Sequence, residues 1–255
     1  MYLNNKVTPL NLAASEFTRE RIIDQLEWTD SIDEDLHFRF NKLVPMPNIL
    51  ACTLRSPDLI VTPEELRQYK EDHKLCGPST YYEQEGLLYW RDIYGPIVES
   101  RCTAECAAKL LQKYGVATYE DFAEKYWGPS YDITSAEEDA QSYSFHSNGN
   151  IAYPFMKVMA QTCPQGHWQW NVSELFDTET LIIEIKDGAI FLEEHWIQRV
   201  DPEHDERDFK TLDSLIWKHA KLWNGADGPQ RALAAAQRLK VGEVYKVTNL
   251  HHRSF

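Results

Sequence analysis

The first hydrophobic pattern along the chain predicts a strand, a helix and a second strand in that order. The mixed run NKVTPLNL forms the first strand, and an apolar stripe over residues 16–28 predicts a helix that Ser15 caps. The run HFRFNKLV alternates as a strand would, and the prolines that follow it end the strand. This segment therefore predicts one β-α-β unit.

The same order of elements returns near residue 140. The run SYSFHS alternates as a strand, NIAYPFMKVMAQTC has the period of a helix, and HWQWNVSELF alternates again. A hairpin follows, because two strand-like runs flank Asp187 and Gly188, a pair that tolerates the positive φ angles of a type I′ turn. These residues therefore predict a second β-α-β unit with a hairpin attached.

Two split β-α-β units predict a ferredoxin-like α+β sandwich, in which helices cover one face of an antiparallel sheet. The core domain is expected over residues 1–197, with an inserted helical segment at about 62–127. Residues 198–255 are expected to form a C-terminal extension on the same core. A separate domain in the middle is disfavoured, because no linker rich in Gly, Ser or Pro marks either junction.

The inserted segment is predicted to be helical. Thr62 and Glu65 form a capping box with Pro63 at the first helical position, and Gly115 and Gly128 have the position of helix ends. The predicted helices are TPEELRQYKEDH, TYYEQEGLLYWRDIYG, TAECAAKLLQKYG and YEDFAEKYW. The extension is predicted to hold an amphipathic helix along Leu212, Leu215, Ile216, Leu222 and Trp223, and a last strand in GEVYKVTNL.

Charge and cysteine content exclude some classes of function. The chain has 40 acidic and 26 basic residues and a formal net charge of -14, so direct binding to nucleic acid is not expected. The N-terminal residues lack the pattern of a signal peptide, and no apolar run approaches a membrane span, so no membrane contact is expected. Five irregularly spaced cysteines are typical of a reducing compartment, which favours a cytoplasmic location.

Local motifs for enzymatic chemistry are missing. The sequence has no phosphate-binding GxxxxGK[ST], no GxGxxG, no GxSxG and no HExxH, which favours a non-enzymatic protein without a cofactor. His73 and Cys76, and Cys102 and Cys106, have zinc-ligand types, but isolated cysteines on helices are most often small buried hydrophobic residues, so no metal site is predicted. A second possible metal cluster is better explained as a solvated acidic loop and consists of Glu193, Glu194, His195, Glu203 and His204.

Clusters of acidic residues suggest an interaction surface. If the fold placed them on one face, they would form a negative stripe able to occupy the basic groove of a nuclease, and the alternative is that they are three solvated loops. The interaction patch comprises Asp33, Glu34, Asp35, Glu137, Glu138, Asp139, Glu203, Asp205 and Glu206.

The stretch EKYWGPSYD places three aromatic side chains around a Gly-Pro breaker and ends on a carboxylate. Aromatic residues beside such a breaker complete a core more often than they bind a ligand, so a structural latch is favoured over a ligand grip. The latch would use Tyr126, Trp127 and Tyr131, and the candidate binding residues for a ligand are Trp90, Tyr126, Trp127, Tyr131 and Asp132.

The order of FNKLVPMP, KYGVATYEDFAEKYWGPSYD and SYSFHS resembles the Api92-like family of phage and plasmid proteins. The resemblance covers most of residues 1 to about 195. It implies a ferredoxin-like domain and a setting among the accessory genes of mobile genetic elements.

Together these features predict a non-enzymatic binding protein of a phage or plasmid, an anti-defence inhibitor that contacts a host or defence-system protein. The alternative is a small-molecule or nucleotide-binding protein, or an enzyme, with a site between the sheet and the inserted helices. A closed pocket with converging polar groups would favour the alternative, and a flat exposed aromatic or acidic patch would favour the inhibitor.

Overall fold

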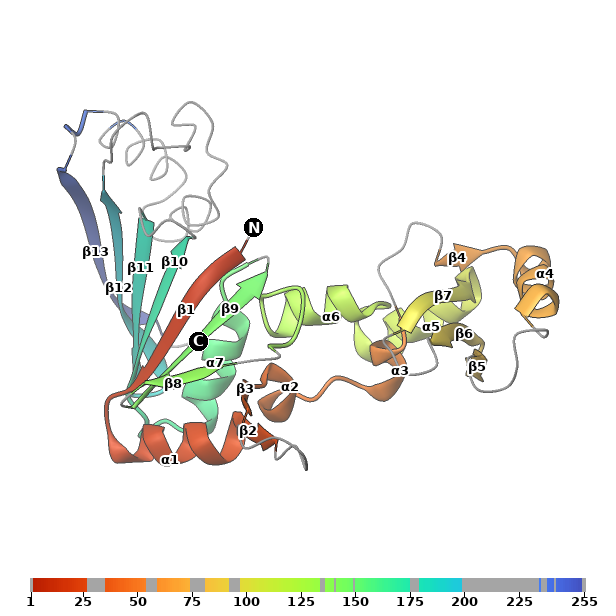
Figure 1. Ribbon diagram of the computed structural model, residues 1–255, viewed down its shortest axis with the longest axis horizontal. Coiled ribbons are helices and arrows are strands. Elements are labelled where there is room, and N and C mark those ends of the chain that lie inside the picture. Colours follow the sequence, from red (N-terminus) through yellow and green to blue (C-terminus); the bar gives the residue numbers. More distant parts are fainter. Residues whose placement is uncertain are drawn as a thin grey trace. The chain divides into compact units, whose positions relative to one another are not determined.

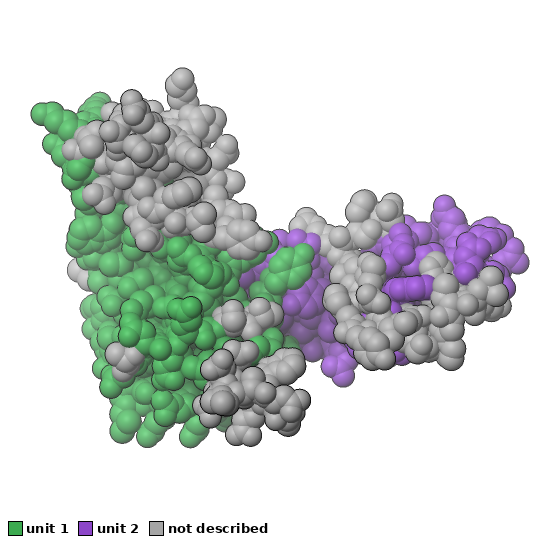
Figure 2. Space-filling view, in the orientation of Figure 1, with its two compact units in different colours: residues 1–44, 131–255 green, residues 45–130 purple. Residues whose placement is uncertain are grey.

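The structure is a computed structural model that describes residues 2–26, 35–53, 59–73, 81–91, 97–133, 136–139, 141–148, 150–174, 179–198, 234, 238–240 and 242–253. The chain divides into two compact units, coloured separately in Figure 2. Unit 1 combines Met1–Val44 with Tyr131–Phe255, and unit 2 is Pro45–Ser130. The fold contains a large antiparallel sheet with several helices, which confirms the α+β class.

Unit 1 is built on a seven-stranded sheet in the order β13-β12-β11-β10-β1-β9-β8 (Figure 1). Every neighbouring pair is antiparallel. The strands are β1 (Tyr2–Pro9), β8 (Glu137–Asp139), β9 (Ser142–Asn148), β10 (Trp168–Glu174), β11 (Glu179–Lys186), β12 (Ala189–Gln198) and β13 (Val244–Arg253). Asp187 and Gly188 turn β11 into β12 with φ angles of 54° and 73°, as the sequence predicts.

Two helices cover one face of this sheet, which we call the inner face. In α1 (Leu12–Arg21), Phe17 packs edge-on against Trp168, whose indole Nε1 donates to Thr18 Oγ1 at 2.9 Å. In α7 (Tyr153–Thr162), Phe155 packs edge-on against Trp170. Trp168 and Trp170 are two residues apart on β10, so their side chains point to the same face of the sheet. Both helices therefore lie on that face.

A small antiparallel pair, β2 (Ile23–Leu26) and β3 (Asp35–Phe38), and the short helix α2 (Phe40–Leu43) complete the described part of unit 1. Phe38 stacks on Phe145 of β9 with 4.3 Å between the ring centroids. The inner face is therefore sealed by aromatic rings that come from both segments of the unit.

Three sequence predictions for the N-terminal segment are wrong. The cap of α1 is Asn11, whose Oδ1 accepts a hydrogen bond from Ala14 N at 2.9 Å, and Ser15 lies inside the helix. The helix ends at Arg21, since the β-branched Ile23 pairs with Phe38 in β2 and β3. The strand predicted to run through HFRFNKLV ends at Phe38, and α2 follows.

Unit 2 contains a four-stranded sheet in the order β4-β7-β6-β5. Strands β4 and β7 are parallel, and the other pairs are antiparallel. Its elements are α3 (Asn48–Ala51), β4 (Ile60–Val61), α4 (Pro63–His73), β5 (Tyr81–Gln84), β6 (Leu87–Arg91), β7 (Ile97–Thr103), α5 (Ala104–Tyr114) and α6 (Tyr119–Tyr126).

The middle of the chain is therefore not helical throughout. The segment predicted as the helix TYYEQEGLLYWRDIYG is the β5-β6 hairpin, which turns at Glu85 and Gly86 with φ angles of 50° and 86°. Tyrosine-rich runs on either side of a residue pair that accepts positive φ favour a hairpin over a helix. Unit 2 also begins before the predicted boundary of about 62, because it includes α3 and β4.

Several local predictions are confirmed. Thr62 N donates to Glu65 Oε2 at 2.8 Å and Glu65 N donates to Thr62 Oγ1 at 3.2 Å, which is a capping box. Gly115 ends α5 with a φ of 73°. The last predicted strand is β13, whereas the predicted helix along Leu212 to Trp223 lies outside the described residues. Within the described residues, no helix is long and apolar enough to cross a membrane.

Candidate ligand pocket on the unit 1 sheet

The face of the unit 1 sheet opposite α1 and α7, here called the outer face, carries a row of polar side chains. His146, Asn4, Ser173 and Thr180 are opposite one another on β9, β1, β10 and β11. Adjacent strands are about 4.8 Å apart, so this row spans about 14 Å. Because side chains alternate between faces, the same strands send buried apolar residues to the inner face.

A second polar row lies one step along the strands. Ser144, Lys6 and Asn171 are opposite one another on β9, β1 and β10, and Glu137 of β8 is opposite Ser144. The two rows surround a pocket with a volume of about 660 Å³. Its lining consists of Asn4, Asn5, Lys6, Leu36, Ala136, Glu137, Ser144, Phe145, His146, Asn171, Ser173 and Thr180.

Two asparagines give the pocket unused hydrogen-bonding capacity. The Oδ1 atoms of Asn4 and Asn171 are buried and accept no hydrogen bond within the part of the chain that the structure describes. Asn5, which points to the inner face, is different: its Oδ1 accepts from Trp170 Nε1 at 3.0 Å and its Nδ2 donates to Ser147 Oγ at 2.8 Å. Because a buried carbonyl oxygen without a donor is destabilising, the two outer oxygens favour a ligand that donates to them.

The charged groups of the pocket nearly balance. Lys6 Nζ lies 3.4 Å from Asp139 Oδ2, and Glu137 is exposed at the rim, with no ion pair to another described residue. No group of three or more His, Cys, Asp or Glu side chains is placed to hold a metal ion within the described ranges. The arrangement therefore suits binding through amides and hydroxyls.

The predicted aromatic residues of EKYWGPSYD lie elsewhere. Trp127 is 1% exposed and packs edge-on against Tyr119 and Phe122, and Tyr126 Oη donates to Tyr114 O at 3.4 Å. These contacts agree with the latch interpretation, because all of them are internal to unit 2. Tyr131, by contrast, is 50% exposed.

The candidate binding residues do not form one group within a single unit. Trp90, half-buried on β6, belongs to unit 2 together with Tyr126 and Trp127, whereas Tyr131 and Asp132 belong to unit 1. The pocket on the outer face contains none of the five.

Asp132 has a structural role. Its Oδ1 accepts hydrogen bonds from Phe40 N at 2.7 Å and Asn41 N at 3.5 Å, which caps α2, and from Ile133 N at 2.9 Å. Burial raises the pKa of Asp132 above its ordinary value, and the backbone N–H groups and the charge of Arg39 offset part of this increase.

Only part of the acidic interaction patch is described. Glu137, Glu138 and Asp139 form the exposed edge strand β8, where Glu138 lies 3.3 Å from Arg19 and Asp139 lies 3.4 Å from Lys6. Asp35 begins β3. The remaining members, Asp33, Glu34, Glu203, Asp205 and Glu206, lie outside the described residues. Two of the three described carboxylates on β8 thus face a cation of unit 1.

The interpretation of Glu193 to His195 as a solvated loop is wrong. These residues belong to β12, and Glu193 and His195 are buried on the inner face. Tyr153 Oη donates to Glu193 Oε1 at 2.6 Å, and His195 Nε2 lies 3.5 Å from Glu179 Oε2. Alternation within IFLEEHWI predicts a strand but not this burial, because Ile190, Leu192 and Trp196 share the face of Glu194, and the irregularity between Ile190 and Leu192 changes which face is buried.

The cysteine pair is buried as expected of structural thiols. Cys102 and Cys106 are 0% and 5% exposed, and burial raises the pKa of Cys102 to about 12. Cys76, Glu203 and His204 lie outside the described residues.

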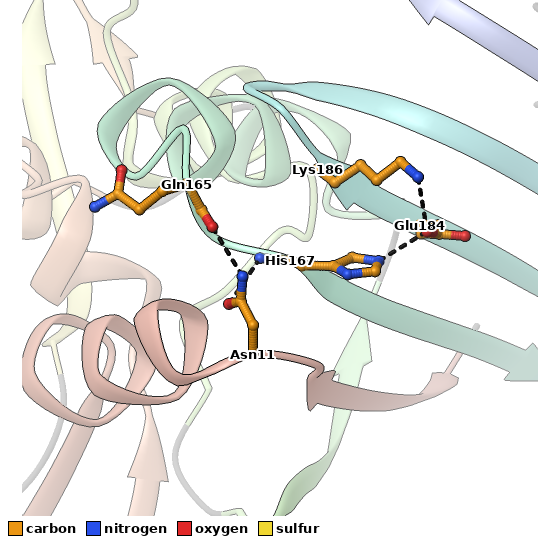
Figure 3. A network of polar contacts seen from close by, with 5 residues as sticks. All are labelled: Asn11, Gln165, His167, Glu184 and Lys186. Carbon is orange, nitrogen blue, oxygen red and sulfur yellow. Dashed lines mark hydrogen bonds and ion pairs between the residues drawn. The ribbon is translucent and has the colours of Figure 1, made fainter.

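A polar network at the start of β10 was not predicted from the sequence (Figure 3). His167 Nε2 lies 2.7 Å from Glu184 Oε1, and Lys186 Nζ lies 3.7 Å from the same oxygen. Asn11 Nδ2 donates to Gln165 O at 2.9 Å, and His167 N donates to Asn11 Oδ1 at 3.2 Å. The N-cap of α1 therefore also holds the turn between α7 and β10. Only the tertiary fold brings these residues together, since up to 156 positions separate them.

Comparisons of the chain with protein-family models, with curated proteins and with solved structures give no match, so the resemblance to the Api92-like family stays a prediction.

Proposed function

We propose that this protein is a non-enzymatic binding protein that holds a small polar molecule in the pocket on the outer face of unit 1. The observation that carries the proposal is the pair of buried oxygens, Asn4 Oδ1 and Asn171 Oδ1, without a donor among the described residues. A pocket of about 660 Å³ lies in the size range of small-molecule sites. The pocket meets one part of the criterion set out from the sequence, the converging polar groups, although it is open to solvent and not closed.

We further propose that the core of unit 1 is ferredoxin-like. The strand order β10-β1-β9-β8 and the connections β1-α1 and β9-α7-β10 support this proposal, because two split β-α-β units produce that order. The position of α1 and α7 on one face also supports it. In such an arrangement the opposite face of the sheet is available to a ligand.

The anti-defence function stays a prediction. It rests on the resemblance to phage and plasmid proteins. It predicts contact with a host or defence-system protein and a cytoplasmic location. The described part of the acidic patch gives this function little support, since Glu138 and Asp139 already face cations. The pocket therefore provides the more direct test of function.

The test is a saturation-transfer NMR screen of the full chain against nucleosides, amino acids and monosaccharides at millimolar concentration. A compound whose signal disappears in Asn171→Ala and persists in Gln169→Ala would support the proposal. Gln169 is the matched control, because it lies two residues from Asn171 on the same face of β10 and outside the pocket lining. If no compound binds, or if a compound binds equally well to the Asn171→Ala variant, the pocket is not the functional site.

A further inference from the structure

We infer that the ligand of the outer-face pocket is an uncharged nucleoside with a donor-rich base edge, of which guanosine is the best match. This inference rests on the proposed function, since it names the ligand of the same pocket. It combines the hydrogen-bonding pattern, the charge balance and the lining of the pocket.

The hydrogen-bonding pattern calls for a ligand with at least two donors. Asn4 is opposite Ser173, and Asn171 lies two residues before Ser173, so the two asparagines are diagonal neighbours on β1 and β10. Such neighbours are about 7 Å apart, a distance that two side-chain amides and one flat ring can bridge. Guanine presents N1–H and N2–H₂ on a single edge, and carboxamide oxygens accept from such groups. The exposed carboxylate of Glu137 at the rim also favours a donating edge.

The charge balance of the described lining disfavours a phosphate as the main binding group. Phosphate sites in proteins use arginine forks, several cations or the N-terminus of a helix. Among the described residues, the lining contains one cation, Lys6, whose ammonium lies 3.4 Å from Asp139, and one anion, Glu137. A nucleotide would place its phosphate near these carboxylates, so we expect it to bind more weakly than the nucleoside.

The remaining lining distinguishes a nucleoside from a simple sugar. Leu36 and Ala136, which form a β-bridge, provide an apolar wall on which a flat ring can rest. Ser144 on β9 and Thr180 on β11 lie at opposite sides of the pocket, and each provides a hydroxyl group that can donate to or accept from a ribose hydroxyl. A monosaccharide alone would leave the apolar wall unused.

The experiment is isothermal titration of the full chain with four probes: guanosine, inosine, guanosine 5′-monophosphate and glucose. Guanosine should bind most tightly. Inosine lacks the 2-amino group and should bind about tenfold more weakly, because one buried acceptor loses its donor. The monophosphate should also bind more weakly than guanosine, and glucose should give no heat. Asn4→Leu and Asn171→Leu should each abolish guanosine binding, whereas the control Gln169→Leu should retain it.

The possible failures separate the inference from the proposed function. If the monophosphate or glucose binds more tightly than guanosine and this binding is lost in Asn171→Leu, the ligand class is wrong and the pocket remains the site. If inosine binds as tightly as guanosine, the inference that the ligand donates through a 2-amino group is overturned. If none of the four probes binds, the inference fails while the wider NMR screen still tests the pocket. If guanosine binds equally to both leucine variants, both proposals are overturned.

Discussion

The carboxylate of Asp132 accepts a hydrogen bond from the backbone N–H of Phe40 at 2.7 Å, although 92 positions separate the two residues in the sequence. Phe40 lies near the end of the first segment of unit 1, and Asp132 lies near the start of the second. This bond therefore joins the two segments between which unit 2 is inserted. It also supplies the acceptor at the start of α2, because the side chain of the N-cap residue Arg39 makes no capping hydrogen bond.

Removal of this cap should destabilise unit 1. We expect Asp132→Ala to lower the free energy of unfolding by about 1–2 kcal/mol, because the N–H groups at the start of α2 lose their acceptor. Asp132→Asn keeps an acceptor oxygen and should remain within about 0.5 kcal/mol of the wild type at low pH. Urea unfolding followed by far-ultraviolet circular dichroism measures both. Equal stability of the alanine variant would contradict the capping role.

The same position should also give a pH dependence. The folded pKa of Asp132 is raised above the ordinary value of 3.8, so folding disfavours the ionised form. The contribution of protonated Asp132 to the free energy of unfolding is complete below the pKa of the unfolded state. It is lost as the pH rises through the pKa of the folded state. Relative to the wild type, Asp132→Asn should therefore gain stability as the pH rises above about 4. Unfolding titrations at constant ionic strength check the sign, and a gain toward low pH would contradict it.

Trp127 should be important for the stability of unit 2. Its indole is 1% exposed and packs on Tyr119 and Phe122, so Trp127→Ala should cost about 3–5 kcal/mol. Tyr131→Ala is the matched control from the same stretch, because that ring is 50% exposed, and it should change the melting temperature little. Differential scanning calorimetry compares the two. An unchanged melting curve of the tryptophan variant would overturn the latch interpretation.

The sequence predicts elements well where a local signal determines them. The capping box of Thr62 and Glu65 and the turn at Asp187 and Gly188 are examples, because the deciding contacts lie within a few residues. It fails where a tertiary contact decides the conformation. Helix α2 lies in a run with the alternation of a strand, and its cap comes from Asp132 in the second segment of unit 1. The sequence also predicts a helix where the hairpin turns at Glu85 and Gly86. Glu-Gly is not one of the residue pairs typical of such a turn, so the local signal is weak.

The candidate site shows the same limit. Alternation along β1 and β10 predicts that Asn4 and Asn171 point to one face of each strand, but not that the two strands are neighbours. A polar residue on the outer face of a strand is normally solvated. Among the residues that the structure describes, these two oxygens accept no hydrogen bond, and this is a property of the packed sheet that no local pattern could have predicted. Aromatic composition led instead to Trp127, which belongs to the core.

Gly166 should tolerate no side chain. A Cβ at this position would overlap the indole ring of Trp168, which is fully buried and hydrogen-bonded to Thr18. We expect Gly166→Ala to destabilise unit 1 by about 1–3 kcal/mol, because the indole has to shift inside a packed core. The exposed neighbour Gln165 contributes only its backbone oxygen to the network, so Gln165→Ala is the control. Near-ultraviolet circular dichroism reports on the tryptophan environment, and an unchanged spectrum and stability in the glycine variant would argue against this packing.

Cys102 should be inert in the folded protein. With a pKa of about 12, the thiolate fraction at pH 8 is about one in ten thousand, and the side chain is fully buried. Iodoacetamide at pH 8 should therefore modify Cys102 slowly in native protein and rapidly in urea. Peptide mass spectrometry resolves each cysteine separately. Rapid modification of Cys102 without denaturant would indicate that β7 is more accessible than its burial implies.

Asn171 provides a test in which stability and binding should change in opposite directions. Its Oδ1 is buried without a donor in the described structure, which destabilises the unliganded protein. Asn171→Leu has a similar shape without the polar oxygen, so the free energy of unfolding should rise by about 1 kcal/mol. The same substitution should abolish binding of the pocket ligand, because the acceptor is lost. Gln169→Leu places the same side chain on the same face of β10 and should leave binding unchanged. If Asn171→Leu instead lowers stability, the carboxamide makes a favourable contact in the unliganded protein. Asn171 would then be retained for folding and not for binding.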